Sequence, residues 1–543
     1  MRLPESLEVF LDHLSIDLHP YSGVRLTSGS LQTCCLPVCY SCEKIASTLR
    51  LPTQVAGSQT HSLGPVLSRK ANGKLDLDLI EPTRSARFRE DSTMTTVFDL
   101  TVAQAARQIE GGALSPVALM ESLLVRTKAL EPGLNVWVTQ DPESALEAAR
   151  QSESELAISG PRGPLHGIPV GIKDIIYTQG VKTTCCSPIY ADFVPDYDAT
   201  VISRLKDAGA IIMGKTVTTQ FASGDPSPTR NPWNIEHTPG GSSSGSAAGV
   251  AARMFPVSLG TQTGGSVLRP ASYNGVVGLK PTFGLISKHG VYPLAWTLDT
   301  VGAFARSVED AALMLNVLAG YDEKDLYSSN RPTSDYHDSI GAQQLPPRIG
   351  VVRQYFEERA DDEVWNHTQD VVERFNSAGA TIEEVTIPTS FDALMEARDV
   401  IGAAEAAQVH QADFAARPDD YSPVIRSTVE KGLPITATSY LKAEHTRRRF
   451  RRDMEKAIVG FDVLLTPSTP TPAPRDLATT GNAMFQSPWT ACGFPTITLP
   501  SGLSASGLPL GTQLASAPYA ENTLLASAHW CEQVLDFTLM PPV

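Results

Sequence analysis

Serine and glycine are concentrated in residues 239–275, in two short clusters. The first cluster, GGSSSG at 240–245, leads into the alanine-rich segment 246–252, a composition that favours a helix. The second, TGGS at 263–266, follows the apolar segment 256–260. Such turns present backbone N–H groups where developing negative charge is favoured. Two turns facing each other would form an oxyanion hole with hydroxyls beside it, although two purely structural turns are the alternative.

A lysine at the end of an apolar segment is the candidate base. Lys173 follows IPVGI at 168–172. A serine hydroxyl becomes a good nucleophile only when a neighbouring group takes its proton. Lysine can take that proton only if burial among neutral neighbours destabilises its ammonium form. The adjacent Asp174 would point to the opposite face of a strand. Taken alone, Lys173 is equally compatible with a structural role.

Two other catalytic motifs are weaker. Residues 241–245 match the GxSxG pattern of a nucleophile elbow, but that elbow requires a strand directly before it, and Pro232 and Pro239 argue against one. Residues 203–206 match SxxK, but Lys206 belongs to an amphipathic segment and is expected at the surface. His237 and His289 are not expected to be catalytic, because the lysine scheme needs no histidine.

Helix signals and short apolar segments alternate after residue 94. Thr101 with Gln104 predicts a capping box, Ser115 before Pro116 predicts a helix start, and Ser307 with Asp310 predicts another. We also expect Asp198 to cap a helix that stops at Gly209, and the helix after Ser307 to close at Gly320. Strands are expected within four segments: 167–172, 210–214, 256–261 and 461–467. This alternation predicts an α/β protein whose sheet is covered on both faces.

Composition bounds the class of protein. The chain of 543 residues is 42% hydrophobic and 19% charged, with a formal charge of −15. These values are typical of a globular protein and argue against a nucleic-acid or anionic-membrane partner. No apolar run is long enough for a membrane span, and no secretory signal is recognisable, so a cytoplasmic location is expected. The arginines of 447–452 are interpreted as a solvated helix face.

Residues 1–93 and 94–543 differ in character. The first segment is irregular and is interpreted as an N-terminal extension, while the second is interpreted as one large domain. Four cysteines at 34, 35, 39 and 42 do not follow a paired zinc-ligand spacing, so no metal is expected. Cys185, Cys186, Cys492 and Cys531 are expected to be small buried side chains.

Long motifs resemble the amidase-signature family. They are GIPVGIKD at 167–174, DATVISRLKDAGAIIMGKT at 198–216, HTPGGSSSGSAAGVAA at 237–252, GTQTGGSVLRPASYNGVVGLKPTFGLIS at 260–287 and FDVLLTPSTPTPAP at 461–474. The resemblance covers residues 94–535. It implies a three-layer α/β/α fold with a large mixed central sheet, and a triad in which Ser266 is the nucleophile, Ser242, held by a cis peptide, is the proton relay, and Lys173 is the base.

The resemblance also implies that Gln262, Thr263, Gly264 and Gly265 form the oxyanion hole or contact substrate, without a metal or organic cofactor. This chain departs from the family pattern near that turn. Gln262 stands where many members have Asp, and Leu268 stands where they have Arg, which here comes one position later as Arg269. Gln220 likewise replaces an acid. These changes leave the triad intact but alter the surroundings of the turn.

The expected activity is hydrolysis of a non-peptide carboxamide C–N bond in a small molecule. Residues 221–225, Tyr190, Phe485 and Trp489 are candidates for the pocket wall. The alternatives are a protein similar to the A chain of glutamyl-tRNA amidotransferase, which passes ammonia to a partner, and an inactive amidase fold used for binding. A homodimer is compatible with the sequence. Residues 67–80 resemble the closing motif of adenylation domains, with its lysine at Lys74. Residues 1–93 are therefore interpreted as an adenylation-domain remnant or a mis-assigned start, which hints at fungal-type secondary metabolism.

Overall fold

The computed structural model describes residues 96–342 and 345–543. The predicted extension, residues 1–93, and the four cysteines within it lie outside the described residues. Within the described ranges, no helix combines the length and apolar character that crossing a membrane requires. In the same ranges, no group of three or more His, Cys, Asp or Glu side chains is arranged to hold a metal ion.

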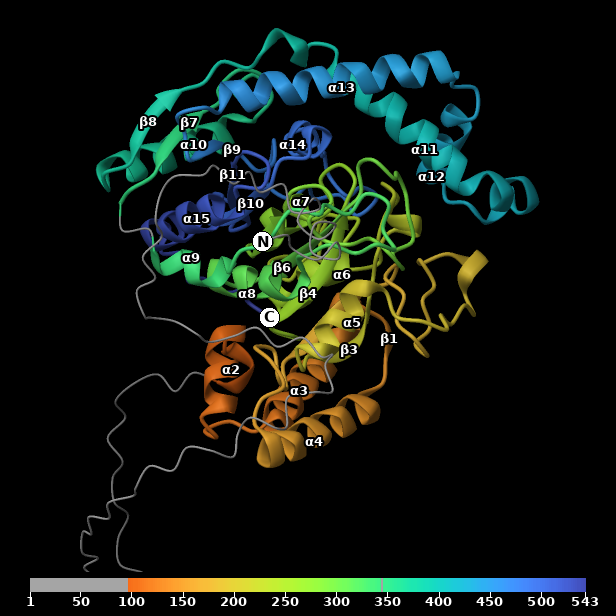
Figure 1. Cartoon of the computed structure of the whole chain (residues 1–543), viewed down its shortest axis with the longest axis vertical. Helices are drawn as coiled ribbons and strands as arrows, with labels where there is room; N and C mark the ends of the chain where they lie inside the picture. Colours follow the sequence, from red (N-terminus) through yellow and green to blue (C-terminus); the bar gives the residue numbers. More distant parts are fainter. Residues whose placement is uncertain (1–95, 343–344) are drawn as a thin grey trace, which may run out of the picture. The chain divides into compact units, whose positions relative to one another are not determined.

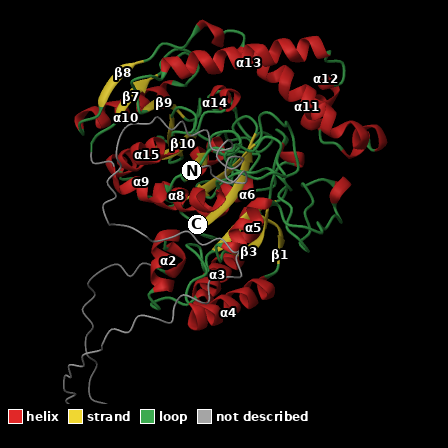
Figure 2. Cartoon of the chain, in the orientation of Figure 1, coloured by secondary structure: helices red, strands yellow, loops and turns green. Residues whose placement is uncertain are grey.

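Eleven strands of the described residues form one mixed sheet, in the order β1-β3-β2-β4-β6-β5-β10-β11-β9-β7-β8 (Figures 1 and 2). The strands are β1 (Trp137–Gln140), β2 (Pro169–Lys173), β3 (Ile211–Thr216), β4 (Val257–Gln262), β5 (Val277–Lys280), β6 (Thr300–Ala305), β7 (Arg348–Val351), β8 (Thr381–Glu384), β9 (Val463–Pro467), β10 (Thr496–Leu503) and β11 (Pro509–Ala515). β2 runs parallel to both β3 and β4, whereas β5, β6, β10 and β11 pair antiparallel. The predicted large mixed sheet is confirmed.

Helices cover both faces of this sheet. α6 and α7 contact each other and the central strands, while α8, α10 and α15 form a second contacting group on the sheet. The α-helices are α2 (Val102–Glu110), α3 (Pro116–Leu134), α4 (Pro142–Ser159), α5 (Thr200–Asp207), α6 (Ser244–Ala251), α7 (Leu268–Asn274), α8 (Val308–Leu318), α9 (Tyr336–Ala342), α10 (Asp362–Ser377), α11 (Leu394–Ala416), α12 (Pro423–Gly432), α13 (Ala437–Ala457), α14 (Ser487–Cys492) and α15 (Glu521–Leu535). Short 3₁₀ helices are η1 (Val97–Asp99), η2 (Pro188–Tyr190), η3 (Gln220–Ala222), η4 (Thr389–Phe391) and η5 (Pro418–Asp420).

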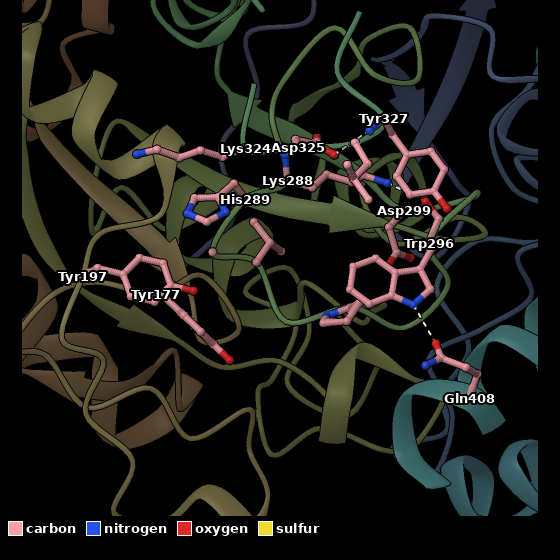
Figure 3. A pocket seen from close by; sticks show the side chains of 14 residues that line it. Tyr177, Tyr197, Lys288, His289, Trp296, Asp299, Lys324, Asp325, Tyr327 and Gln408 are labelled. Atoms are coloured by element: carbon pink, nitrogen blue, oxygen red, sulfur yellow. Dashed lines mark hydrogen bonds between the residues drawn. The ribbon is translucent and has the colours of Figure 1, made fainter. Parts of the chain in front are cut away.

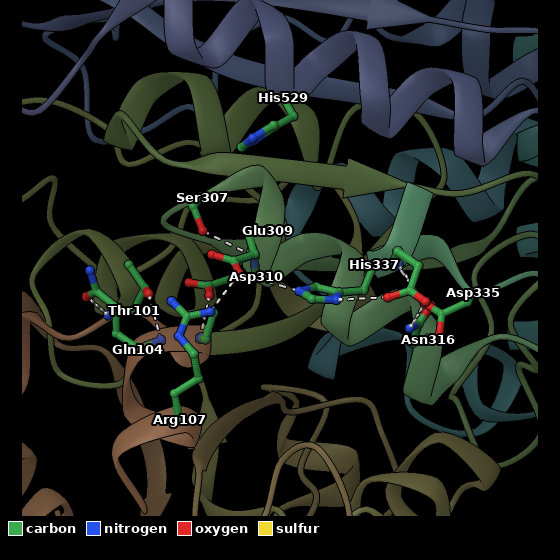
Figure 4. Close-up of polar contacts among 12 residues, drawn as sticks. Thr101, Gln104, Arg107, Ser307, Glu309, Asp310, Asn316, Asp335, His337 and His529 are labelled. Carbon is green, nitrogen blue, oxygen red and sulfur yellow. Dashed lines mark hydrogen bonds and ion pairs between the residues drawn. The ribbon is translucent and has the colours of Figure 1, made fainter. Parts of the chain in front are cut away.

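Three predicted helix starts are confirmed. Thr101 and Gln104 form a capping box on α2, and Ser115 accepts from the third residue of α3. Ser307 accepts from the N–H of Asp310 at the start of α8. Figure 4 shows how the start of α8 meets the start of α2. The Asp310 carboxylate accepts from a backbone N–H of α2, so the two helix starts are joined across about 200 residues.

One expected helix cap was wrong. Asp198 does not cap α5, whose N-cap is Ala199. The Asp198 carboxylate instead accepts from the N–H of Gln179 and pairs with Lys206 at 2.6 Å. This tertiary contact displaces the local cap. The two expected helix ends are confirmed, since α5 closes with C-cap Ala208 directly before Gly209 and α8 with C-cap Ala319 directly before Gly320.

The buried cysteines largely match expectation. Cys185, Cys492 and Cys531 are buried and Cys186 is half-buried, all as free thiols. No strand directly precedes GGSSSG, since the described residues between 231 and 243 form turns and loops before α6 begins. The nucleophile-elbow alternative is therefore wrong.

Close backbone packing at Gly245 positions the serine-rich turn. A Cβ on Gly245 would stand 2.3 Å from the carbonyl oxygen of Val136 and 2.6 Å from the backbone nitrogen of Val217. Its own N–H donates to the Val217 carbonyl oxygen at 3.0 Å. Only glycine lets α6 approach the end of β3 this closely.

We predict that Gly245→Ala destabilises the protein by about 1–3 kcal/mol, because the added methyl group meets fixed backbone atoms. Gly133→Ala is the matched control: this helical glycine has open space around it, and alanine there is expected to stabilise by about 0.4–1 kcal/mol. The urea denaturation midpoint measures both. Equal midpoints for the two variants would contradict the packing account.

Candidate active site

Lys173 is the last residue of β2 and is fully buried. Its Nζ donates to Oγ of Ser242 at 2.8 Å and to Oγ1 of Thr261 at 2.9 Å. Thr261 lies on β4, which runs parallel to β2 as its immediate neighbour. Burial lowers the pKa of Lys173 from 10.5 to about 7, and the charges of Asp299 and Cys186 oppose this shift only partly. The amine is therefore a base that is available near neutral pH.

Asp174, in the turn after β2, makes no hydrogen bond or ion pair to Lys173 among the described residues. Its carboxylate accepts from the backbone N–H and hydroxyl of Thr184, and its charge acts on Lys215. Lys215 is a second buried lysine, but its Nζ donates to the Ile176 carbonyl oxygen and the Thr183 hydroxyl. Lys215 thus has a carbonyl acceptor that Lys173 lacks. Of these two lysines, only Lys173 donates a hydrogen bond to the serine-rich turn.

The turn that carries Ser242 is held by its main chain. The peptide bond between Gly241 and Ser242 is cis, as the resemblance implies, and Ser242 is fully buried. The carbonyl oxygen of Gly241 accepts from Nη2 of Arg269 at 2.6 Å. Arg269 also donates to the Gly481 carbonyl oxygen and the Thr480 hydroxyl. The arginine that is displaced by one position in this chain therefore ties the turns that carry Ser242 and Ser266 to a third loop.

Ser266 lies between β4 and α7, at the wall of a cavity of about 520 Å³. Thr263, Gly264 and Gly265 line the same cavity. The side chain of Ser266 makes no hydrogen bond to any described residue, and the residue is 8% exposed. Nor do the described residues use the N–H groups of Gly264, Gly265 and Ser266 in hydrogen bonds. A free hydroxyl and free N–H donors thus meet at one cavity wall.

Gln262 supports this turn from behind. It is fully buried and does not line the cavity. Its Oε1 accepts from the N–H groups of Val267 at 2.9 Å and Leu268 at 3.0 Å, and its Nε2 donates to Thr490 Oγ1. Thr490 in turn donates to the carbonyl oxygen of Gly264 at 2.7 Å. A neutral amide can both accept and donate here, which fixes the turn without an acid–arginine pair.

Asp299 is a residue that the sequence analysis missed. Its Oδ1 accepts from the hydroxyl of Thr263, and its Oδ2 accepts from the N–H groups of Leu294 and Ala295. Burial raises the pKa of this carboxyl. Asp299 also lines a second cavity of about 600 Å³, where Figure 3 shows it near Lys288 and Trp296. No local motif marks it, because it reaches the turn only through the fold.

The expected pocket wall is correct in part. Within 221–225, Ala222, Ser223 and Gly224 line the cavity beside Ser266. Phe221 instead packs in a cluster of rings that includes Tyr190, and Asp225 accepts from the first N–H groups of α12. Phe485 and Trp489 pack against Phe356 in the core.

Helices α11 and α12 supply the far wall, with Arg398 and Lys431 among the lining residues. His237 and His289 do not line this cavity, and His237 bonds the Ala473 carbonyl oxygen.

Known proteins match this chain over most of its length. The Amidase family model matches residues 118–525. The A component of the glutamyl-tRNA(Gln) amidotransferase of Geobacter metallireducens is 36% identical over 474 residues, which cover 80% of this chain and 97% of that relative. The native peptide amidase of Stenotrophomonas maltophilia is 30% identical, with a TM-score of 0.72 over 81% of this chain and 98% of that one. A 6-aminohexanoate cyclic dimer hydrolase is 25% identical, with a TM-score of 0.74 over 82% and 99%. The chain belongs to the amidase-signature family.

Proposed function

We propose that the protein is an amidase that cleaves the C–N bond of a small-molecule carboxamide through an acyl-enzyme on Ser266. The observation that carries this proposal is the buried Lys173 amine, with its pKa near 7 and its hydrogen bond to Ser242. A lysine placed in this way is suited to accept a proton and is poorly suited to a purely structural ion pair.

In the proposed reaction, the Ser266 oxygen attacks the amide carbonyl carbon while its proton passes to Ser242. Ser242 gives its own proton to Nζ of Lys173. Collapse of the tetrahedral intermediate breaks the C–N bond, and the proton returns through Ser242 to the leaving nitrogen. Water then repeats the sequence on the acyl ester. No hydrogen bond joins the two serine hydroxyls within the described residues; contacts of this kind often tighten only when substrate binds.

The oxyanion of the intermediate would be held by the N–H groups of Gly264, Gly265 and Ser266. Those of Val267 and Leu268 are already used by Gln262. In our scheme, Gln262 and Thr490 therefore position the turn, and substrate contacts only its first part. Preorganised donors of this type contribute about 3–4 kcal/mol of transition-state stabilisation each.

A second candidate function is that of an amidotransferase component, which would pass ammonia from the same cleavage to a partner protein. The near-complete alignment with the A component of glutamyl-tRNA(Gln) amidotransferase favours it. Ammonia release from simple amides distinguishes the two candidates. The amidase proposal expects turnover by the purified chain alone, whereas the amidotransferase component would be inactive without its partner.

We predict that activity rises with pH along a limb centred near 7, because Lys173 must be neutral to accept the proton. Lys173→Ala should abolish this limb and lower kcat by about 10²–10⁴-fold. Lys173→Arg should not restore activity, since guanidinium stays protonated. The measurement is kcat against pH for each variant. A Lys173→Ala enzyme with the same limb would rule out lysine as the base.

Asp299→Asn should move that limb to lower pH. The Asp299 carboxylate favours the ammonium form of Lys173 and so raises its pKa, and removing the charge lowers it. Asp325→Asn is the control, because Asp325 lines the second cavity beside Lys288 and does not act on Lys173. The pH dependence of kcat reports both. A limb that stays in place, or moves to higher pH, in Asp299→Asn would contradict this electrostatic coupling.

We further propose that residues 1–93 are dispensable. The residues assigned to catalysis and to the cavity wall fall between 173 and 483. A chain that begins at Met94 should therefore keep kcat within about twofold of the full chain, a change well under 1 kcal/mol in the barrier. Loss of both solubility and turnover in the shortened chain would refute the proposal.

A further inference from the structure

The cavity beside Ser266 has an excess of positive charge. Its lining includes Arg269, Arg398 and Lys431, and its only lining carboxylate among the described residues is Asp399. The chain as a whole has a formal charge of −15, so this local excess runs against the overall composition. The rest of the lining is mostly small or apolar. A cavity with this lining favours an anionic ligand over a neutral one of the same shape.

Arg269 is not available for that ligand. It is 5% exposed, and its two terminal nitrogens are occupied by the Gly241 and Gly481 carbonyl oxygens and the Thr480 hydroxyl. Its role is to hold the turns together. Its charge remains at the cavity wall.

Arg398 is differently placed. Only its Nη1 is bonded, to Asp399 on the next residue, whose side chain is 69% exposed. An ion pair that is so exposed to water is weak, and its partners exchange readily. Nη2 makes no hydrogen bond to any described residue, and Nε is buried without a partner. The guanidinium thus has unused donors next to the cavity.

The catalytic turn lies directly against this guanidinium. A Cβ built on Gly264 would stand 2.6 Å from Nη2 of Arg398. Gly264 is two residues from Ser266, and two residues of backbone span at most about 7 Å. A group bound by Arg398 therefore lies within a few bonds of a carbonyl carbon at Ser266.

The second cavity provides a comparison, because the positive charge of its Lys288 is compensated by nearby groups. There the Lys288 ammonium donates to the Trp296 carbonyl oxygen and lies over the rings of Phe283 and Tyr327, with Asp299 and Asp325 nearby (Figure 3). The Lys288 ammonium is surrounded by acceptors and carboxylates. Arg398 has no comparable set of partners among the described residues.

We propose that the substrate carries a carboxylate within a few bonds of its scissile amide, and that Arg398 binds this carboxylate. Guanidinium matches a carboxylate in both charge and hydrogen-bond geometry, which makes arginine a strong selector for it. The inference rests on the proposed amidase function in one respect: it takes the bound anion to be a part of the amide substrate. Arg398 is then a specificity-determining residue of the cavity.

Two pairs of substrates test the proposal. Glutaramate and pentanamide differ only in a carboxylate or a methyl group at the acyl end. N-Acetyl-β-alanine and N-propylacetamide differ in the same way on the leaving-group side. We expect the full chain to prefer the anionic member of at least one pair by tenfold or more in kcat/KM, and the pair that responds identifies the side. In Arg398→Met that ratio should fall to near one.

Two further variants make the result specific. Asp399→Asn removes the competing carboxylate and should raise the ratio at least twofold. Arg449→Met removes an exposed arginine of α13 outside the cavity and should leave the ratio unchanged. If Arg398 had a merely structural role, Arg398→Met would lower kcat/KM equally for both members of a pair. That outcome, or a wild-type ratio near one in both pairs, would overturn the proposal.

Binding separates this inference from the proposed function. In Ser266→Ala, calorimetric titration with the anionic and neutral members of each pair measures recognition without turnover. If the wild-type chain cleaves no amide but this variant binds an anionic member tenfold more tightly, and Arg398→Met cancels the difference, recognition stands and the hydrolysis proposal fails. If the wild-type chain cleaves amides but shows no preference for the anionic member in rate or in binding, the hydrolysis proposal stands and the recognition proposal fails.

Discussion

An amine buried without a carboxylate partner is the constraint on which the candidate site depends. Lys173 is fully enclosed, and the hydrogen-bond acceptors of its Nζ are two hydroxyls. An ammonium in such surroundings loses the stabilisation that water provides, and no directly bonded counter-ion replaces it. The neutral form of the amine is therefore favoured. The sheet creates this situation. β2 is enclosed between β3 and β4, and the charge of Asp174, in the turn after β2, acts on Lys215.

Around that amine, the geometry is fixed mostly through the main chain. Arg269 holds the Gly241 carbonyl oxygen, Gln262 holds two N–H groups after Ser266, and Asp299 holds the Thr263 hydroxyl. Each of these groups bonds a turn and makes no hydrogen bond to Ser266. They therefore position the turns while leaving the Ser266 hydroxyl and the preceding N–H groups unoccupied. This division explains how the chain can change family-typical residues near the turn without displacing Lys173, Ser242 or Ser266.

Sequence reasoning succeeded where the signal was local. The strands around Lys173 and before Ser266 are short apolar segments, and Thr101, Ser115 and Ser307 cap helices by contacts within three residues. It failed where a distant group decides the outcome. Asp198 would be a good cap by itself, but Lys206 and Gln179 hold its carboxylate elsewhere.

For the same reason Asp299 and Arg398 could not be found in the sequence. Asp299 meets the turn 36 positions away from Thr263, and Arg398 reaches Gly264 from helix α11. β8 also escaped prediction, since its exposed and half-buried residues give no apolar pattern. Local motifs thus named the candidate reacting groups, while their supports and the charge of the cavity required the tertiary structure.

The pKa of Lys173 in the folded protein is the most direct test of this account. Lysines labelled with ¹³C at Cε can be titrated by NMR, and the signals of Lys173 and Lys215 can be assigned from single substitutions. The account predicts that Lys173 titrates near 7, below the value near 8 of Lys215. A Lys173 signal that titrates near 10, like a solvent-exposed lysine, would contradict the claim that burial makes this residue the base.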